Sequence, residues 1–311
     1  MAAFGAETLI LHELSSAQLQ DADARYPKWA TICRLRLLGL PVLNAALIIP
    51  GEGESRIAAV IEALAKSTGS EQLMLRSDGG IERRRYYQGG NSFSLEELKV
   101  RVAPLLDQGR AVILLEPTNR FTNRMTALLR MERSMAGGRG SFTIEALGPG
   151  YDVADLTRGG VRPQVTVTAT DIDWACYRPL WWSDLRLSQD RAPAAEQERR
   201  RQHLERIGSH VLSDTYALDP GLLSADPAGA AEAWLRKSGY LELWDDQEIT
   251  DMITQRARDW FECAFLITKF HRNKAWTCLA AAVSNLGAGR WVFWDVVDGN
   301  YKYGSTRGRL T

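Results

Sequence analysis

The sequence predicts an α+β fold of two lobes, with a helical insertion in its C-terminal half. Three patterns carry this prediction. Residues 56–66 (RIAAVIEALAK) have the apolar spacing of an amphipathic helix. Residues 111–117 (AVILLEP) are a short continuous apolar run, typical of a buried strand. Near the C-terminus two apolar runs flank the segment SNLGAG, which is the pattern of a β-hairpin.

The front of the chain alternates helix and strand. Residues 16–39 have helical spacing up to a glycine, and LPVLNAALIIP follows as a strand closed by a proline. After the 56–66 helix, EQLMLRSDGG runs from a short strand into a glycine turn. Residues 94–108 start with Ser and have Glu three positions later, which predicts a helix with an N-terminal capping box.

The second half contains strands, then helices, then the hairpin. SFTIEAL and VRPQVTVTAT have the β-branched and alternating character of strands. Residues 191–270 are rich in Ala, Glu, Arg and Gln at helical spacing, interrupted by a linker-like stretch at 218–229. We therefore expect an N-terminal lobe over 1–110 and a C-terminal lobe over 111–311, the latter including a helical segment at about 191–272.

Composition excludes several classes of function. Lys plus Arg and Asp plus Glu both number 38, so no net charge would gather nucleic acid. No run approaches the roughly 18 apolar residues of a membrane span. No secretory signal is visible at the start, so we expect a cytoplasmic protein. The four cysteines and four histidines are scattered, without the spacing of a zinc site.

The densest polar signal is LRSDGGIERRRYYQGGNSFS, a Gly-rich segment that we expect to act as a phosphate loop near residues 76–92. Glycines let backbone N–H groups approach an anion, and Arg76 can neutralise its oxygens with a forked contact. Gly89, Gly90 and Ser92 would supply further donors. A plain β-hairpin explains the same pattern equally well.

Two further polar groups follow apolar strands. AVILLEPTNRFTNRM places Glu116 and Arg120 at a strand end, where backbone groups can hold a planar ligand and an Arg can reach phosphates. FTIEALGPGYDVADLTRGGVRPQ combines Glu145 with Arg162 and Gly-rich turns, which suits a charged substrate or a ribose. A surface turn and ordinary salt bridges, respectively, are the alternatives.

The last apolar strand ends in acidic residues. In WVFWDVVDGN, Asp295 is the candidate metal ligand. Magnesium bound to nucleotide phosphates takes one or two carboxylates from the protein and keeps several waters, so one Asp facing a cleft suffices. An Asp-Gly turn that satisfies its own backbone is the alternative reading of this segment.

Taken in order, these segments resemble the ATP-grasp nucleotide-binding domain of phosphoenolpyruvate synthase and pyruvate phosphate dikinase. RYPKWATICRLRLLGLPVLNAALIIP is similar to the opening of that family, Leu75-Arg76-Ser77 to its Val-Arg-Ser-Ser strand, and YYQGGNSFS to its phosphate loop. The stretch GSFTIEALGPGYDVADLTRGGVRPQ also resembles a strand and acidic Gly-rich turn of the family. The resemblance implies two α+β lobes that clamp ATP.

The resemblance also implies roles for single residues. Lys28 would be the phosphate-contacting lysine, and Lys28, Arg76 and Arg162 the catalytic cations. Ser77 would join the nucleotide contacts. The AVILLEP strand, with Leu115 and Glu116, would be the inter-lobe hinge that holds adenine.

The resemblance further implies that Asp295 is a ligand of Mg²⁺. The family uses a Glu or Gln at this position of its final strand. The first arm of the final hairpin would carry a second acidic ligand, but Thr277 or Cys278 is expected there. A missing ligand of this kind would impair metal binding.

The expected function is that of an ATP- and Mg²⁺-dependent enzyme acting on an unidentified small-molecule acceptor. A ligase that activates a carboxylate as an acyl phosphate for attack by an amine is favoured, because no histidine lies in the Gly-Gly-x-Thr/Ser-x-His motif of a phosphohistidine carrier. A kinase-like or dikinase-like phosphotransferase and a non-catalytic nucleotide-binding subunit are the alternatives. Neither nucleic acid nor membrane is expected as a partner; a partner protein or a homo-oligomer is left open.

Overall fold

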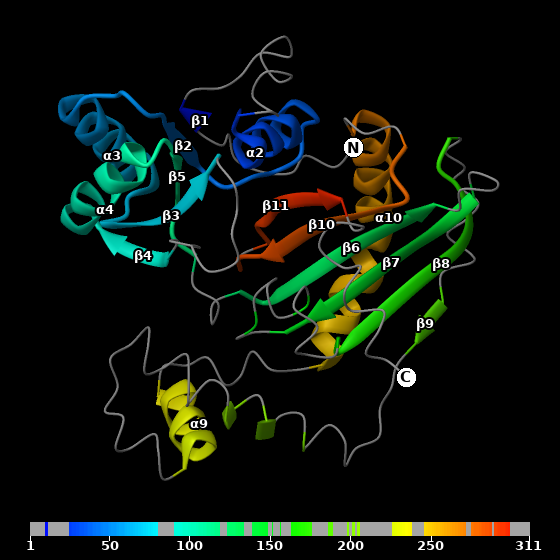
Figure 1. Cartoon of the computed structure of the whole chain (residues 1–311). Coiled ribbons are helices and arrows are strands. Elements are labelled where there is room, and N and C mark those ends of the chain that lie inside the picture. Colours follow the sequence, from blue (N-terminus) through cyan, green and yellow to red (C-terminus); the bar gives the residue numbers. More distant parts are fainter. Residues whose placement is uncertain are drawn as a thin grey trace.

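Two β-sheets form the framework of the chain, and a single helix lies between them (Figure 1). The coordinates are a computed structural model. They describe residues 10–11, 25–79, 90–118, 123–133, 139–148, 151, 156, 163–175, 186–188, 198, 201–202, 204–205, 226–237, 246–271, 275–287 and 289–298. The predicted α+β class is confirmed, because helices pack against both sheets.

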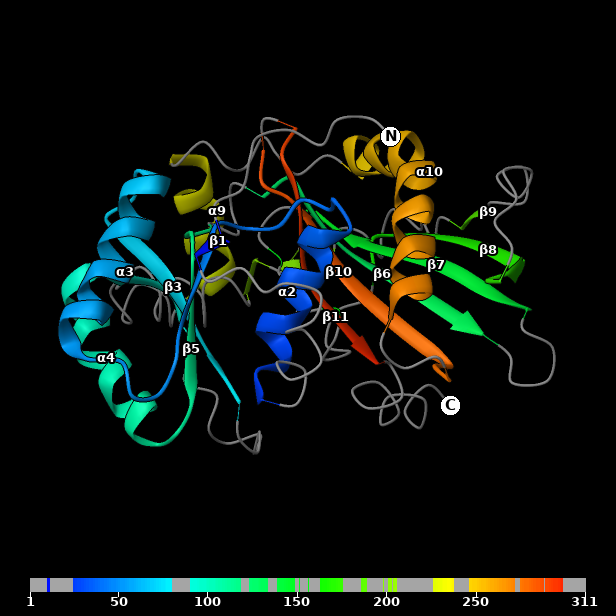
Figure 2. The ribbon, with the colours of Figure 1, turned by 90° about the horizontal axis from the view of Figure 1, so that it is seen from above.

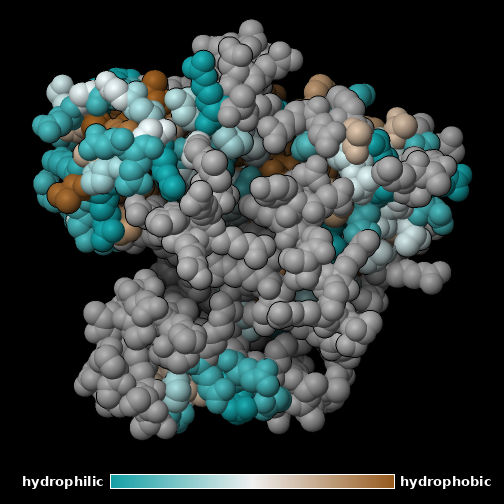
Figure 3. Space-filling model, viewed as in Figure 1, coloured by the Kyte–Doolittle hydropathy of each residue, from teal (hydrophilic) through white to brown (hydrophobic). Residues whose placement is uncertain are grey.

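The first sheet has five strands in the order β1-β2-β5-β3-β4. Its strands are β1 (Ile10–Leu11), β2 (Ala45–Ile48), β3 (Gln72–Asp78), β4 (Gly90–Ser94) and β5 (Ala111–Leu115). All pairs are antiparallel except β1 with β2. Helices α3 (Glu54–Thr68) and α4 (Leu95–Asp107) bury apolar side chains against one face, and their visible outer surface is mainly hydrophilic (Figure 3).

The second sheet has six antiparallel strands in the order β11-β10-β6-β7-β8-β9. They are β6 (Met125–Arg133), β7 (Arg139–Leu147), β8 (Val165–Asp173), β9 (Arg186–Ser188), β10 (Cys278–Asn285) and β11 (Trp291–Asp298). Helix α10 (Asp246–Phe270) crosses one face of this sheet, and α9 (Pro227–Lys237) lies apart from it (Figure 1).

Helix α2 (Pro27–Leu37) joins the two sheets (Figure 2). It contacts both β3 and β11. One apolar core includes α2, the inner faces of β2, β3 and β5, the second sheet and α10. Trp29 of α2 is completely buried in this core. The N–H of Phe293 on β11 also donates to the carbonyl of Pro41, in the connection from α2 to β2, at 2.8 Å, so a backbone contact ties this connection to the second sheet.

The elements predicted for the described residues are confirmed, whereas strands β1, β6 and β9 were not predicted. The capping box of α4 is formed by Ser94 and Glu97, which bond each other's backbone N–H groups. Strand β6 was not predicted, because MTALLRMER carries four charged or polar side chains among its apolar ones. Strand β5 belongs to the first sheet, so that sheet extends to Leu115 and the expected boundary after residue 110 falls one strand too early. In the described part of the chain, no helix is both long and apolar enough to span a bilayer.

A distant carboxylate caps the start of α2. The helix has no acidic residue in its first turn and no side-chain cap of its own. Asp78, at the end of β3, accepts hydrogen bonds from the backbone N–H of Lys28 at 3.3 Å and of Trp29 at 2.8 Å. These are among the N–H groups that a helix cannot satisfy internally. Asp78 is only 2% exposed, so α2 is tied to the first sheet by a buried polar contact.

Removal of the Asp78 cap is expected to destabilise the protein. We expect Asp78→Ala to lower the free energy of unfolding by about 1–3 kcal/mol, because two helical N–H groups and that of Gly79 lose a buried acceptor. Denaturant unfolding measures this change. A loss no greater than that of the surface variant Glu96→Ala on α4 would contradict it.

The same carboxyl predicts a pH dependence. Burial raises the pKa of Asp78 above its ordinary value of 3.8, against backbone hydrogen bonds that lower it. The protonated group therefore adds to stability below the unfolded pKa, and this contribution is lost as the pH rises through the folded pKa. The free energy of unfolding of the wild type, relative to Asp78→Asn, should thus be larger near pH ~4 than near pH ~7. A difference that is constant with pH would contradict this.

Candidate functional site

An ion pair between the two sheets is the centre of the candidate site. Nη2 of Arg76 lies 3.4 Å from Oδ2 of Asp295, and each side chain is 18% exposed. The two residues are 219 positions apart in the chain. Arg76 was expected to contact phosphate and Asp295 to bind a metal, and the fold brings the two side chains together at one place.

Strand geometry explains why these two side chains meet. On β3, side chains alternate between the faces of the sheet. Leu73 and Leu75 pack against α3 and α4, so Arg76 turns toward the second sheet. On β11 the pairing with β10 shifts, since Ala282 pairs with Asp295 whereas Val283 pairs with Phe293.

The shift makes Trp294 the extra residue of a β-bulge. Bulges re-aim neighbouring side chains and recur beside functional sites. The indole N–H of Trp294 donates to Oγ of Ser284 at 2.8 Å, which fixes the bulge on β10. The bulge therefore sets the direction of Asp295, the next residue along β11.

Lys28 lies beside the same strand end. Its Nζ donates to the carbonyl of Ser77 at 2.9 Å, one residue from Arg76. The two cations expected to contact phosphates are thus placed around the end of β3. Ser77 contributes its carbonyl; its side chain is buried on the opposite face of the strand from that of Arg76.

Asp295 is a suitable but incomplete metal ligand. Its partner on β10 is Ala282, whereas Thr277 and Cys278, where the second acidic ligand was expected, lie at the start of that arm. Among the described residues, no three His, Cys, Asp or Glu side chains are grouped to hold a metal ion. One carboxylate fits a cation that takes its other ligands from phosphate and water, as magnesium does.

Glu145 shares a face with Asp295 but lies far from it. Direct pairing connects Glu145 to Leu128, Leu128 to Ala282, and Ala282 to Asp295, across four adjacent strands. Three inter-strand spacings place the Cα atoms of the two residues roughly 14 Å apart. The two residues are therefore not neighbours on the sheet.

The Glu145 carboxylate has a partner of its own. It accepts from Nη1 of Arg130 at 3.1 Å, and Nη2 of Arg130 reaches Glu132 at 3.3 Å. Burial lowers the pKa of Arg130, whereas the charges of Glu145 and Glu132 raise it. The raising effects are together the larger, so the pKa of Arg130 lies above its ordinary value.

Glu116 is buried at the end of β5 and makes a second link between the sheets. Its carboxylate accepts from Nδ2 of Asn44 at 2.6 Å and pairs with Arg290, at the tip of the β10–β11 hairpin. The Glu116 side chain is 7% exposed. Its expected role at a hinge that holds adenine stays a prediction, and both of its carboxylate oxygens contact protein groups. The buried side chain of Leu115 lies in the shared core.

The Gly-rich segment is described only at its ends. β3 and β4 pair in antiparallel fashion, as the hairpin alternative requires, and Gly90 is paired with Leu75. Ser92 lies within β4. Gly89, Arg120 and Arg162 lie outside the described residues, so their expected roles stay predictions.

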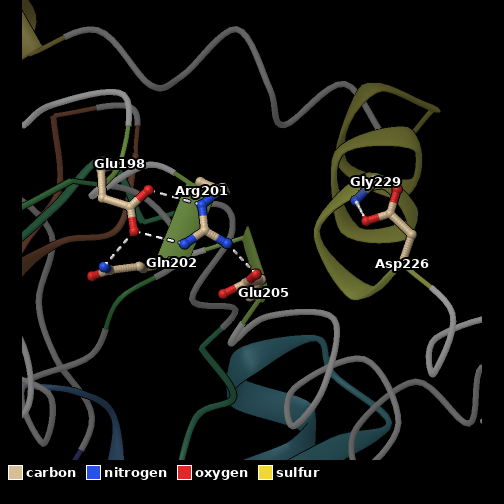
Figure 4. A network of polar contacts seen from close by, with 6 residues as sticks. All are labelled: Glu198, Arg201, Gln202, Glu205, Asp226 and Gly229. Atoms are coloured by element: carbon tan, nitrogen blue, oxygen red, sulfur yellow. Dashed lines mark hydrogen bonds and ion pairs between the residues drawn. The ribbon is translucent and has the colours of Figure 1, made fainter. Parts of the chain in front are cut away.

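A further polar network lies on the helical segment near residue 200 (Figure 4). Arg201 contacts Glu198 and Glu205, and Glu198 also accepts from Gln202. The hydrogen bond from Arg201 lowers the pKa of Glu198 to about 2. The Arg201 side chain is 52% exposed, and such surface pairs are typical of solvated helices, so we assign no site here.

Comparison with known proteins gives only distant similarity. No family model and no curated protein sequence matches the chain. Among solved structures, it is similar to D-cycloserine synthetase DcsG (10% identity, TM-score 0.37), to the ADP complex of the N5-carboxyaminoimidazole ribonucleotide synthetase PurK (8%, 0.37) and to the ATP-grasp ligase PsnB with a minimal precursor (8%, 0.33). The matches cover 88%, 90% and 94% of this chain, but only 62%, 46% and 57% of those structures.

The link through Glu116 predicts an energetic coupling between the sheets. In a double-mutant cycle of Glu116→Gln and Arg290→Gln, we expect a coupling energy of about 1–3 kcal/mol, because removal of one partner leaves the other poorly compensated. The exposed pair of Glu96 and Lys99 on α4 is the control, with an expected coupling of about 0.2–0.5 kcal/mol. Equal couplings for the two pairs would refute the link.

Proposed function

We propose that this chain is an ATP- and Mg²⁺-dependent enzyme of the ATP-grasp type, and that it acts as a ligase. The observation that carries the proposal is the 3.4 Å contact between Arg76 and Asp295. A cation suited to phosphate and a carboxylate suited to a phosphate-bound metal lie at the joint of two α+β units. This is the arrangement that the sequence resemblance implies.

Two cations would hold the phosphates. The guanidinium of Arg76 presents several N–H donors in a planar fork that matches phosphate oxygens, whereas the ammonium of Lys28 acts as a point charge. Both are anchored by β3, one through its own backbone and one through the Ser77 carbonyl. Fixed cations at partly buried positions stabilise the charge that develops during phosphoryl transfer.

Asp295 would anchor the metal. When bound, magnesium neutralises phosphate oxygens and polarises the transferring group. The bulge at Trp294 and the contact with Arg76 support this proposal, because they hold the carboxylate between the two sheets next to a cation suited to phosphate. Glu145, roughly 14 Å away on the same face, is proposed to contact a part of the ligand remote from the metal.

The proposed chemistry is activation of a small carboxylate as an acyl phosphate, followed by attack of an amine. This choice over direct phosphoryl transfer rests on the absence from the sequence of a phosphohistidine carrier motif. The site should thus release ADP and phosphate. The identity of the acceptor is left to experiment.

One observation favours a non-catalytic nucleotide-binding subunit as a second candidate. The strand next to Asp295 offers Ala282 where a second carboxylate would strengthen the metal site. Such a protein would bind ATP without turning it over.

The first test is ATP turnover with magnesium, in the presence of mixed carboxylates and amines. A ligase releases ADP and phosphate, a kinase releases ADP without phosphate, a dikinase releases AMP, and a binding subunit binds ATP but releases none of these. We expect ADP, detected by chromatography of the products. Absence of nucleotide binding under all conditions would refute the proposal as a whole.

The second test uses single substitutions. Arg76→Ala and Lys28→Ala should each weaken ATP binding by about 10- to 100-fold, since each removes a charged hydrogen-bond partner of the phosphates. Asp295→Asn should mainly reduce magnesium-dependent turnover. The control is Glu96→Gln on the outer face of α4, and circular dichroism confirms folding. Normal affinity in both cation variants would remove them from the site.

A further inference from the structure

Arg76 and Asp295 neutralise each other at the place where a phosphate and its metal would each need one of them. A metal-free triphosphate approaching Arg76 meets a guanidinium already engaged by a carboxylate. It also meets the negative charge of Asp295 at close range, which repels phosphate. Free nucleotide is therefore opposed twice by the same residue.

The geometry of the ion pair allows Arg76 and Asp295 each to leave the other for a ligand. The Nη2–Oδ2 distance of 3.4 Å is longer than the ~2.7–2.9 Å of strong charge-assisted hydrogen bonds. Both side chains are 18% exposed, so they are partly desolvated yet within reach of solvent. Breaking the pair is costly only if a charge is left without a new partner.

We propose that this ion pair selects the magnesium complex of the nucleotide over free nucleotide. The inference rests on the proposed function, because it requires a phosphate ligand. Asp295 exchanges the guanidinium for the divalent cation that the phosphates carry, and Arg76 exchanges the carboxylate for phosphate oxygens. Each charge regains an opposite partner, so only the complex of cation and phosphate opens the pair without loss.

The exchange makes the two ligands cooperative. The cation and the nucleotide each bind better when Arg76 and Asp295 are separated. The cation therefore raises the affinity for the nucleotide, and the nucleotide raises the affinity for the cation by the same factor. Lys28 differs in this respect. Its Nζ donates to the carbonyl of Ser77, and its charge also interacts with Asp78. The carboxyl of Asp78 is held by backbone N–H groups at the start of α2 and is not a proposed metal ligand, so Lys28 should serve metal-free and metal-bound nucleotide alike.

The experiment measures ATP binding by calorimetry at constant ionic strength, once with a chelator and once with excess magnesium. In chelator, Asp295→Asn should bind ATP more tightly than the wild type by roughly 5- to 150-fold, the usual range of such couplings. Magnesium should strengthen ATP binding in the wild type and do so much less in Asp295→Asn. Lys28→Ala should weaken both forms by the same factor.

Two further variants make the test specific. Glu96→Gln removes one carboxylate from the outer face of α4 and should behave as the wild type in both conditions, which excludes a general effect of net charge. Adding Arg76→Met to Asp295→Asn should abolish the gain in chelator, because the released guanidinium is its source.

The outcomes separate the inference from the proposed function. If the wild type binds ATP but Asp295→Asn gains no affinity in chelator, the selection is wrong while the nucleotide site stands. If the gain in ATP affinity in chelator is also seen when Arg76 is replaced, the proposed selection is wrong as well. If the wild type and Glu96→Gln bind no ATP in either condition, the proposed function fails and the inference fails with it.

Discussion

The alternation of side chains along β3 is the constraint on which the joint between the two sheets depends. On the side turned toward the second sheet, this strand presents Met74 to the shared core, Arg76 to Asp295 and Asp78 to the start of α2. The other side carries Leu73 and Leu75 into the core under α3 and α4. A shift of one residue in the pairing of β3 with β5 would exchange the two sets and disrupt both cores.

The polar side chains between the two sheets are buried or half-buried, and each faces a hydrogen-bond donor or a group of opposite charge. Asp78 meets helical N–H groups, Arg76 meets Asp295, and Glu116 meets Arg290. Buried charges without partners are strongly unfavourable, so such pairing is a condition of folding at this place. The degree of burial separates their roles. Asp78 and Glu116 are closed by protein groups, whereas the pair of Arg76 and Asp295 keeps some exposure, as a site that exchanges partners requires.

The β10–β11 hairpin links the sheets at two points. Arg290, at its tip, reaches Glu116 at the end of β5, and Asp295, after the bulge, reaches Arg76 on β3. The backbone bond from Phe293 to Pro41 lies between them in sequence. Residues of the first sheet and of the connection from α2 to β2 therefore hold β11 near Asp295.

Local patterns in the sequence determined most of the elements, because apolar periodicity and capping residues act over a few positions. The 94–108 helix with its capping box, the buried AVILLEP strand and the final hairpin all follow from such patterns. Arg76, Lys28 and Asp295 were also selected from local chemistry and family resemblance. Strand β6 was not predicted, because its charged side chains, including Arg130 and Glu132, obscure the alternation of apolar and polar residues.

Only the tertiary structure decided which of these residues meet. The contact of Arg76 with Asp295 depends on a bulge at Trp294 and on a core shared by both sheets, and neither has a local signature. The cap that Asp78 gives α2 was hidden because the SDGG segment reads as a simple turn. The separation of Glu145 from Asp295 likewise follows from strand order, which sequence periodicity does not specify. Long-range pairing of this kind is set by packing of the whole chain, so residues selected one by one from local patterns needed the fold to bring them together.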